Sequence, residues 1–119
     1  MTRINANIPP CELVGKHLLA EHREIKRIPN TIASGKARLE NIPTTFSLGK
    51  GHVKFFYDKQ TFLLRRYKQL YKECIKRGYN VTDYTNAWDN VPKHLFNDYQ
   101  FTDQENQLVR DRIALRLSK

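Results

Sequence analysis

The chain has 119 residues, enough for one domain over residues 1–119 with a single buried core, and too few for two. Its 21 Lys and Arg side chains outnumber 12 Asp and Glu, which gives a formal net charge of +9. The sequence contains no apolar run of transmembrane length, no secretory signal and no CxxC pair. These observations predict a reduced, cytoplasmic protein that binds a polyanion, and nucleic acid is the favoured partner.

Positive charge is concentrated in the middle of the chain. Residues 51–80 hold eight basic and two acidic side chains, whereas residues 81–119 hold five basic and six acidic ones. Because a solvated surface without a special role mixes the two signs more evenly, we expect this middle third to face phosphate groups.

The first helix is predicted from about Pro10 to Ile28. A Pro-Pro pair suits the helix start, and Pro29 is expected to end or kink the helix. Apolar side chains that share one arc of a helical wheel predict the face turned to the core. They are Val14, Leu18, Ile25 and Ile28.

The second helix is predicted from about Val53 to Arg77, with Gly78 as a left-handed cap after it. One face of this helix is apolar and is expected to be buried; it carries Phe56, Leu63, Tyr67, Leu70, Tyr71 and Cys74. Basic side chains lie almost opposite: Lys54, Arg65, Lys72 and Lys76.

The third helix is predicted from a capping box at Thr102–Glu105 to about Arg116. Residues 29–52 contain several turn formers, residues 79–101 are aromatic and rich in Asn, and both segments are expected to form irregular loops. No segment shows the sustained alternation that is typical of a strand. The expected fold class is therefore all-α, a single compact domain of three main helices with long irregular loops.

Two carboxylates of the first helix are candidates for chemistry. Glu21 projects into the apolar arc, and Glu24 lies at its border, next to a cationic row of Lys16, Arg23 and Arg27. A carboxylate between an apolar wall and cations has an environment that tunes acid–base behaviour. The alternative is ordinary ion pairing on the helix surface, and periodicity alone favours that alternative.

Metal or cysteine chemistry is not indicated. The four histidines and two cysteines show no metal-ligand spacing, so structural or DNA-contacting histidines are the favoured interpretation. Cys74 lies on the apolar face of the second helix and is expected in the core. Gly49-Lys50-Gly51 lacks the Walker pattern and predicts a turn before a helix.

Several blocks then occur in a characteristic order: Thr2-Arg3-Ile4-Asn5, Glu12-Leu13, His17 to Glu24, Arg27-Ile28-Pro29-Asn30, Leu48 to Val53, Phe55 to Lys59 and Glu73 to Gly78. Together they resemble the pyrimidine-dimer DNA glycosylases of the phage endonuclease V type. The likeness covers most of residues 1–81, weakens from Thr82 to Phe101, and returns loosely in a basic third helix.

The resemblance implies a bifunctional DNA glycosylase and abasic-site lyase that needs no metal or organic cofactor. Its nucleophile is the α-amino group of Thr2, exposed once Met1 is removed, and its acid–base group is Glu24. An α-amino group with a pKa near 7.7–8.0 is about one-third neutral at pH 7.5, whereas a lysine is only about 0.1% neutral. The positive charges of Arg3 and Arg23 are expected to favour the neutral amine further.

The resemblance also implies damaged double-stranded DNA as the partner of a monomeric enzyme. Expected phosphate contacts near the lesion come from Arg3, Lys16, His17, Arg23 and Arg27. Expected non-specific duplex contacts come from the basic face of the second helix and from the third helix, through Lys54, Arg65, Lys72, Arg110 and Arg112.

The sequence departs from the family pattern in three places. Lys16 stands where relatives commonly have glutamine, and His22 stands where an aromatic residue is usual. The sequence shows no Trp/Tyr-rich C-terminal tail, so the candidates for stacking contacts are Tyr84, Trp88 and Tyr99.

Two other functions stay open at this point. The same scaffold acting on another lesion, or on abasic sites only, is one alternative. A non-catalytic basic DNA-binding protein is the other, and such a protein has no need of the Thr2 and Glu24 pair.

Overall fold

The computed structural model describes residues 2–118, and within this range the chain forms helices and no β-strand. The α-helices are α1 (Gly15–Glu24), α2 (Arg27–Ala33), α3 (His52–Phe55), α4 (Gln60–Lys76) and α5 (Asp103–Leu117). Short 3₁₀ helices lie at Pro10–Glu12, Thr85–Trp88 and Lys93–Leu95. The predicted all-α fold class with long irregular loops is confirmed.

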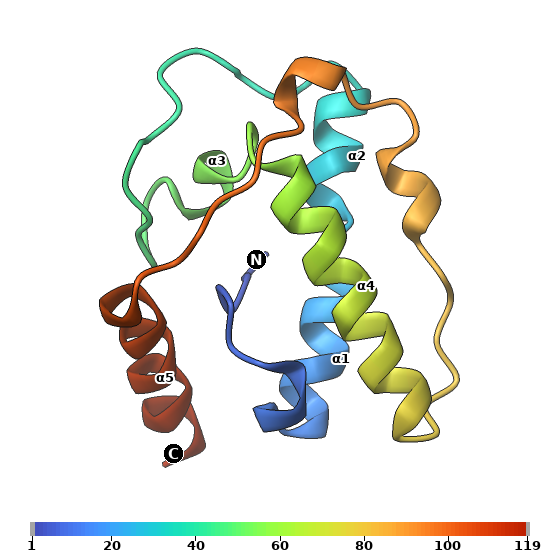
Figure 1. The fold of residues 1–119 in the computed structure, drawn as a ribbon, viewed down its shortest axis with the longest axis vertical. Coiled ribbons are helices and arrows are strands. Elements are labelled where there is room, and N and C mark those ends of the chain that lie inside the picture. The colour runs from blue at the N-terminus through green and yellow to red at the C-terminus, as the bar shows by residue number, and fades with distance from the viewer. Residues whose placement is uncertain (1, 119) are drawn as a thin grey trace.

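The N-terminal segment, residues 4–8, is the centre of the arrangement. Helices α1 and α4 pack against each other, and the N-terminal segment runs between this pair and α5 (Figure 1). Its Ile8 carbonyl accepts from Arg66 of α4, and its Asn7 N–H donates to the Asn106 side chain of α5 at 3.2 Å. The start of the chain therefore joins elements that are far apart in sequence.

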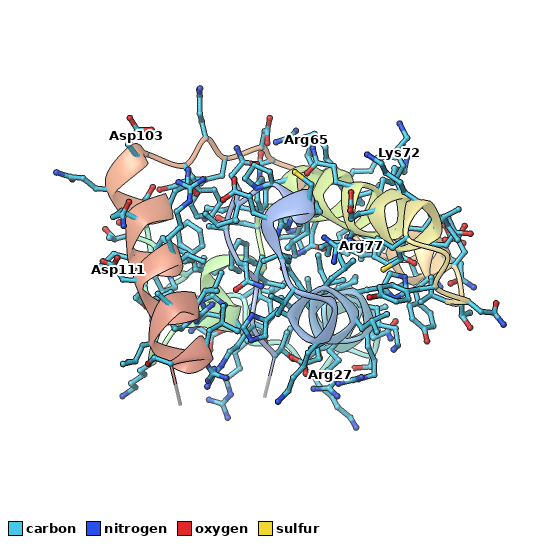
Figure 2. The ribbon with its side chains drawn as sticks, turned by 90° about the horizontal axis from the view of Figure 1, so that it is seen from below. Arg27, Arg65, Lys72, Arg77, Asp103 and Asp111 are labelled. Atoms are coloured by element: carbon cyan, nitrogen blue, oxygen red, sulfur yellow. The ribbon has the colours of Figure 1, made fainter. Side chains whose placement is uncertain are left out.

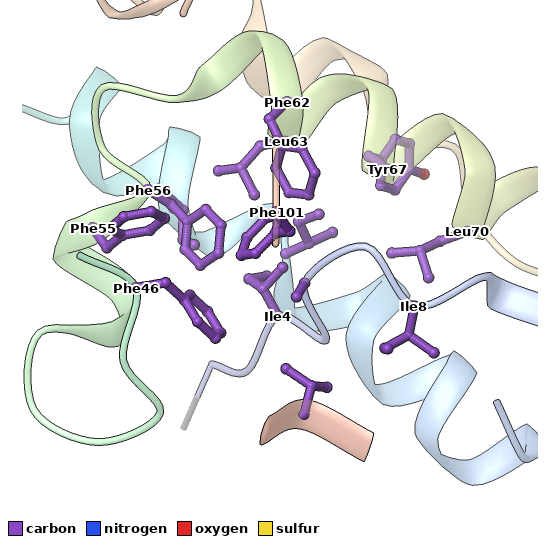
Figure 3. Close-up of a cluster of buried hydrophobic side chains, with 14 of the residues drawn as sticks. Ile4, Ile8, Phe46, Phe55, Phe56, Phe62, Leu63, Tyr67, Leu70 and Phe101 are labelled. Carbon is purple, nitrogen blue, oxygen red and sulfur yellow. The ribbon is translucent and has the colours of Figure 1, made fainter. Parts of the chain in front are cut away.

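A cluster of aromatic rings fixes this segment in the core. Ile4 and Ile8 are at most 2% exposed; Ile4 lies beside phenylalanines from several elements, whereas Ile8 lies nearer to Leu70 of α4 (Figure 3). Phe46 and Phe101, for example, pack edge to face with ring centroids 5.0 Å apart. Because Ile4 is held in this cluster, the two residues before it leave the core from a fixed point.

The first predicted helix is divided in the structure. The regular helix is interrupted by a turn at Ile25 and Lys26, although both residues keep right-handed helical dihedral angles, and Pro29 lies in the first turn of α2 rather than at a helix end. Proline fits there because N–H groups in a first turn have no intrahelical acceptor, so the missing donor removes no hydrogen bond. The other residues of the predicted stripe are buried, but Val14 precedes α1 and is 41% exposed.

The second predicted helix is interrupted between α3 and α4. After Phe56 the chain leaves the helical path; Lys59 Nζ donates to Phe55 O at 2.9 Å, and the Gln60 side chain donates to Phe56 O at 2.8 Å. Phe55 and Phe56 are both fully buried, whereas adjacent side chains on one straight helix point about 100° apart. Because the long helix α4 begins only at Gln60, Lys54 belongs to α3. Its predicted place on the basic face of the long helix is therefore wrong.

Two helix ends are as predicted. Thr102 Oγ1 accepts the Glu105 N–H at 3.1 Å, and the Glu105 carboxylate accepts the Thr102 N–H at 3.0 Å, which completes the capping box of α5. Gly78 follows α4 with a φ of +82°, a conformation that glycine adopts without steric strain.

The basic middle of the chain contains several charges that are paired within the protein. Four of the eight basic side chains between residues 51 and 80 form ion pairs within the protein: Lys59 with Asp58, Arg65 with Asp98, Arg66 with Glu21, and Arg77 with Glu73. Arg66 is fully buried, and Lys59 is 8% exposed. Charge counted along a sequence does not show which charges are paired in the fold, and the predicted phosphate-facing surface stays a prediction.

Candidate functional site

A buried histidine anchors the N-terminal segment to the loop before α3. His52 Nδ1 lies 2.8 Å from Ser47 O, and a carbonyl only accepts, so Nδ1 carries the proton. Nε2 therefore accepts the Ile4 N–H at 2.9 Å. The turn predicted at Gly49-Lys50-Gly51 places His52 at the start of α3. The backbone is thus fixed two residues after Thr2.

This anchor makes stability depend on pH. Burial, the largest cause, lowers the pKa of His52 below its ordinary 6.5, although the hydrogen bond to Ser47 opposes the shift. The unfolded chain takes up this proton near pH 6.5 and the folded protein only at a lower pH. The stabilisation is therefore complete above pH 6.5 and is expected to fall as pH drops through 6.5 toward the folded pKa.

Urea unfolding at pH 7.5 and pH 5 measures this effect, with His52→Gln as the comparison. The drop in unfolding free energy between the two pH values is expected to be smaller in the variant. It does not vanish, because burial also lowers the pKa of His22. An equal drop in both proteins contradicts the role of His52.

Among residues 2–118, three adjoining cavities form a cleft beside the N-terminal segment. The central chamber, of about 290 Å³, is lined by Arg3, Asn5, His17, Ala20, Glu21, Glu24, Arg112, Ile113 and Arg116. The Thr2 chamber, of about 450 Å³, is lined by Thr2, Arg3, residues 48–54 and Tyr57. The outer chamber, of about 550 Å³, is lined by Lys16, His17, Ala20, Arg112, Leu115 and Arg116. The central and outer chambers share His17, Ala20, Arg112 and Arg116 as lining residues, and the central and Thr2 chambers share Arg3.

Glu24 is the last residue of α1 and lines the central chamber. Its side chain is only 16% exposed, and its Oε2 lies 3.6 Å from Nη2 of the more exposed Arg23. Arg3 and Arg112 line the same chamber. A carboxylate in this position is placed to stabilise positive charge on a bound substrate and to move protons.

A buried polar network lies under the central chamber. Arg66 Nε and Nη2 donate to the two Glu21 oxygens at 2.8 and 3.0 Å, and Arg66 Nη1 donates to Ile8 O. Asn5 Nδ2 donates to Glu21 Oε1 at 2.7 Å, and Arg112 Nη2 donates to Asn5 Oδ1 at 3.1 Å. The network therefore joins α4, α1, the N-terminal segment and α5.

Glu21 was singled out by its place in the apolar arc, but its partner was not predicted. Ordinary ion pairing would have placed that partner on the surface of the same helix, whereas Arg66 is 45 residues away. Periodicity describes one helix at a time, so it does not pair residues across two helices. The available signal was Glu21 itself, because a carboxylate on a buried face requires a cation.

The predicted DNA-binding residues fall into two groups. Five of them line the cleft: Arg3, Lys16, His17, Lys54 and Arg112. Arg23 lies beside Glu24, and Arg27 begins α2 directly after α1. The cleft thus carries cations at each chamber.

The other candidates lie elsewhere. Arg65 and Lys72 project from the side of the molecule opposite to Arg27 (Figure 2), and Arg65 forms hydrogen bonds to both Asp98 oxygens at 3.0 and 2.7 Å. Arg110 Nη2 lies 3.2 Å from Glu12 Oε2, so this arginine is paired with a carboxylate. Any contact of Arg65 or Lys72 with DNA is therefore separate from the contacts made at Arg27.

The aromatic residues proposed for stacking on a lesion are engaged in the fold. Trp88 is 4% exposed. The Tyr99 hydroxyl donates to Glu105 and its ring packs against Phe101, while Lys26 Nζ lies 3.9 Å from the centre of the Tyr84 ring. Trp88 is therefore too deeply buried to stack on a lesion in this conformation, whereas Tyr84 and Tyr99 are only partly buried, and stacking contacts from these two side chains stay a prediction.

The histidine and cysteine at two other singled-out positions are structural. His22 packs among Tyr67, Tyr71 and Tyr84, and its Nε2 lies 3.0 Å from the Tyr67 hydroxyl. It therefore fills the place of the aromatic residue that is usual there. Cys74 is buried in α4, as predicted.

Neither a metal-binding cluster nor a membrane-spanning helix occurs in the described part of the chain. No group of three or more His, Cys, Asp or Glu side chains in residues 2–118 is arranged to hold a metal ion. No helix within these residues has the length and apolar character needed to cross a membrane.

A small helical protein whose cationic cavities are lined also by a carboxylate fits the class of nucleic-acid-processing proteins. Residues 1–87 match the family model described as pyrimidine dimer DNA glycosylase. The match covers more than half of the chain, which belongs to the pyrimidine dimer DNA glycosylase family. It is thus a DNA-repair glycosylase that binds damaged DNA. The matched range holds α1 to α4, whereas α5 lies beyond it.

Proposed function

We propose that the protein cleaves the glycosylic bond of a cyclobutane pyrimidine dimer in double-stranded DNA and then breaks the strand at the abasic site, acting as a monomer. The Thr2 α-amino group is the nucleophile and Glu24 is the acid–base group. The observation that carries this proposal is that Thr2 and Glu24 line adjoining chambers which share Arg3. The free amine requires the removal of Met1, which lies outside the described residues.

The proposed reaction uses an amine in place of a metal-activated water. The Thr2 nitrogen attacks C1′, and the glycosylic bond breaks with its electron pair leaving on the base, which is protonated. The Thr2 nitrogen then loses a proton, the C1′–O4′ bond of the sugar ring breaks and O4′ takes up a proton, which leaves a protonated imine between Thr2 and C1′. Glu24 accepts a proton from C2′, the C3′–O bond breaks, and the 3′ phosphate leaves. Water then hydrolyses the imine and restores the amine.

The walls of the cleft supply the proposed DNA contacts. Arg3 and Arg112 line the central chamber, and Lys16 extends the positive charge to the outer chamber. His17 Nδ1 is buried and has no hydrogen-bond partner within residues 2–118, so a polar atom of the substrate can satisfy it. The guanidinium groups of Arg3 and Arg112 suit phosphate binding because a guanidinium binds phosphate oxygens through two parallel hydrogen bonds.

Borohydride trapping on abasic duplex DNA tests the proposal. Reduction of the imine is expected to leave a stable adduct, and peptide mapping is expected to place it on the α-amino group of Thr2. A Lys50→Gln variant is the control, because Lys50 is a lysine amine in the same chamber and the adduct should persist without it. No adduct, or an adduct on a lysine, contradicts the mechanism.

A separate experiment tests the lesion. Irradiated plasmid is expected to be nicked and unirradiated plasmid is not.

A further inference from the structure

Asn5 occupies an unusual position between two charged groups. It is 8% exposed and forms hydrogen bonds to Glu21 of α1 and to Arg112 of α5 through the two ends of one amide. The matched family region contains Asn5 and Glu21, whereas Arg112 lies beyond it. The Asn5 amide therefore connects the part of the chain that matches the family model directly to α5, which lies beyond the match.

The chemistry of the two neighbours fixes the orientation of this amide. The Glu21 carboxylate only accepts hydrogen bonds, so it faces the Asn5 NH₂ group, at 2.7 Å. The Arg112 guanidinium only donates, so it faces the Asn5 carbonyl oxygen, at 3.1 Å. A flipped amide loses both hydrogen bonds. Because Asn5 lies between the two charged groups, Arg112 bonds to a neutral carbonyl oxygen and not directly to the Glu21 carboxylate.

The inner side of the network is rigid. The side chains of Glu21 and Arg66 are 1% and 0% exposed, and two hydrogen bonds join them. Ala6, next to Asn5, adopts a φ of +48°, and the turn closes with Ile8 N–H donating to Asn5 O at 3.1 Å. Asn5 is therefore held by its backbone as well as by its side chain.

The outer side of the network is held less firmly. Arg112 donates to Asn5 through Nη2, while its Nη1 is buried without an acceptor among residues 2–118. Burial lowers the pKa of Arg112, and Glu21 opposes this shift. An arginine shielded from water attracts a phosphate more strongly than a solvated one does, provided that its direction is fixed.

We propose that Asn5 is a positioning residue that holds the Arg112 guanidinium against the central chamber in the direction needed to bind a DNA phosphate. The inference rests on the proposed contact between Arg112 and DNA. It does not depend on the Thr2 and Glu24 chemistry. Asn5 acts through Arg112, because it transmits the fixed position of the Glu21–Arg66 pair to α5.

The salt dependence of DNA binding measures this role. Removing one phosphate-binding cation lowers the slope of log K against log salt concentration by about 0.9. Arg112→Ala is expected to lower the slope by about this amount, and Asn5→Ala is expected to weaken binding of a duplex with an uncleavable abasic analogue roughly tenfold and to lower the slope similarly. In an Arg112→Ala background, Asn5→Ala is expected to change neither quantity further.

Asn106→Ala is the matched control, because it removes another hydrogen bond between the N-terminal segment and α5 without touching Arg112. Its salt slope is expected to equal that of the unchanged protein. If Asn5→Ala keeps the full slope while Arg112→Ala lowers it, the positioning role is overturned. If Arg112→Ala also keeps the full slope, the proposed phosphate contact fails too, and trapping at Thr2 is still tested separately.

A second variant covers the case in which Asn5→Ala does not fold. Asn5→Ser keeps a polar group at this position, but its single short hydroxyl does not bond both Glu21 and Arg112 as the Asn5 amide does. Asn5→Ser leaves the Glu21–Arg66 pair in place and is expected to weaken binding and to lower the salt slope, as Asn5→Ala does. A folded Asn5→Ser variant that binds as tightly as the unchanged protein with the full salt slope overturns the proposal.

Discussion

Replacing Glu24 by glutamine is expected to remove strand cleavage while damaged DNA still binds. The substitution keeps the shape of the side chain in the central chamber, but it removes the negative charge that stabilises the cationic sugar and accepts the C2′ proton. A positioned acid–base group contributes roughly 10²- to 10⁴-fold to a rate, so single-turnover cleavage should fall by at least about 100-fold. Gel-shift binding and cleavage of the same irradiated duplex measure both effects.

A matched control is the same chemical change at Glu40, which is exposed in the loop after α2. Glu40→Gln also removes one negative charge, and its cleavage rate is expected to stay within about twofold of the unchanged protein, because surface charges are screened by salt. Unchanged turnover in Glu24→Gln refutes its acid–base role. Loss of binding together with cleavage assigns Glu24 to substrate binding instead.

Replacing Arg66 by methionine is expected to cause a large loss of stability. The change leaves the Glu21 carboxylate, whose side chain is 1% exposed, without its cation. Breaking a buried ion pair by removing one partner costs about 3–5 kcal/mol. For a domain of this size the melting temperature should fall by roughly 10–20 °C. Thermal unfolding followed by circular dichroism measures the change.

The neighbouring arginine provides the control for this prediction. Arg65→Met breaks the pair with Asp98, but these side chains are 46% and 56% exposed, and such pairs contribute less than about 1 kcal/mol. Similar destabilisation by both variants contradicts the special role of the buried pair. Glu21→Met combined with Arg66→Met is expected to regain part of the stability, since no unpaired charge then stays buried.

Features that depend on near neighbours were predictable from the sequence. The capping box at Thr102, the left-handed Gly78 and the burial of Cys74 were all found where the pattern placed them. Each depends on residues within one helix or at its end. The interruptions after Glu24 and after Phe56 were not predicted, because the path of the chain there depends on packing and on side-chain bonds to the backbone.

The candidate site was predictable only through resemblance and in outline. Periodicity placed Glu24 at a border between apolar and basic residues, which is also typical of an ordinary solvated helix. Its place in the cleft required α5 and the N-terminal segment to meet α1, which the Asn5 bonds to Glu21 and Arg112 show. Such long-range contacts follow from the packing of the whole chain.

The amino-acid sequence determined that this protein is helical, strongly basic and a member of its glycosylase family. Only the tertiary structure decided which cations are accessible to a ligand. Arg66 is paired with Glu21 in the core, Arg65 is paired with Asp98 at the surface, and Arg112 lines the cleft. The physical reason is that a charge acquires its role from its partners and its access to water. Both depend on which residues are neighbours in three dimensions, and the order of residues along the chain does not give these neighbours.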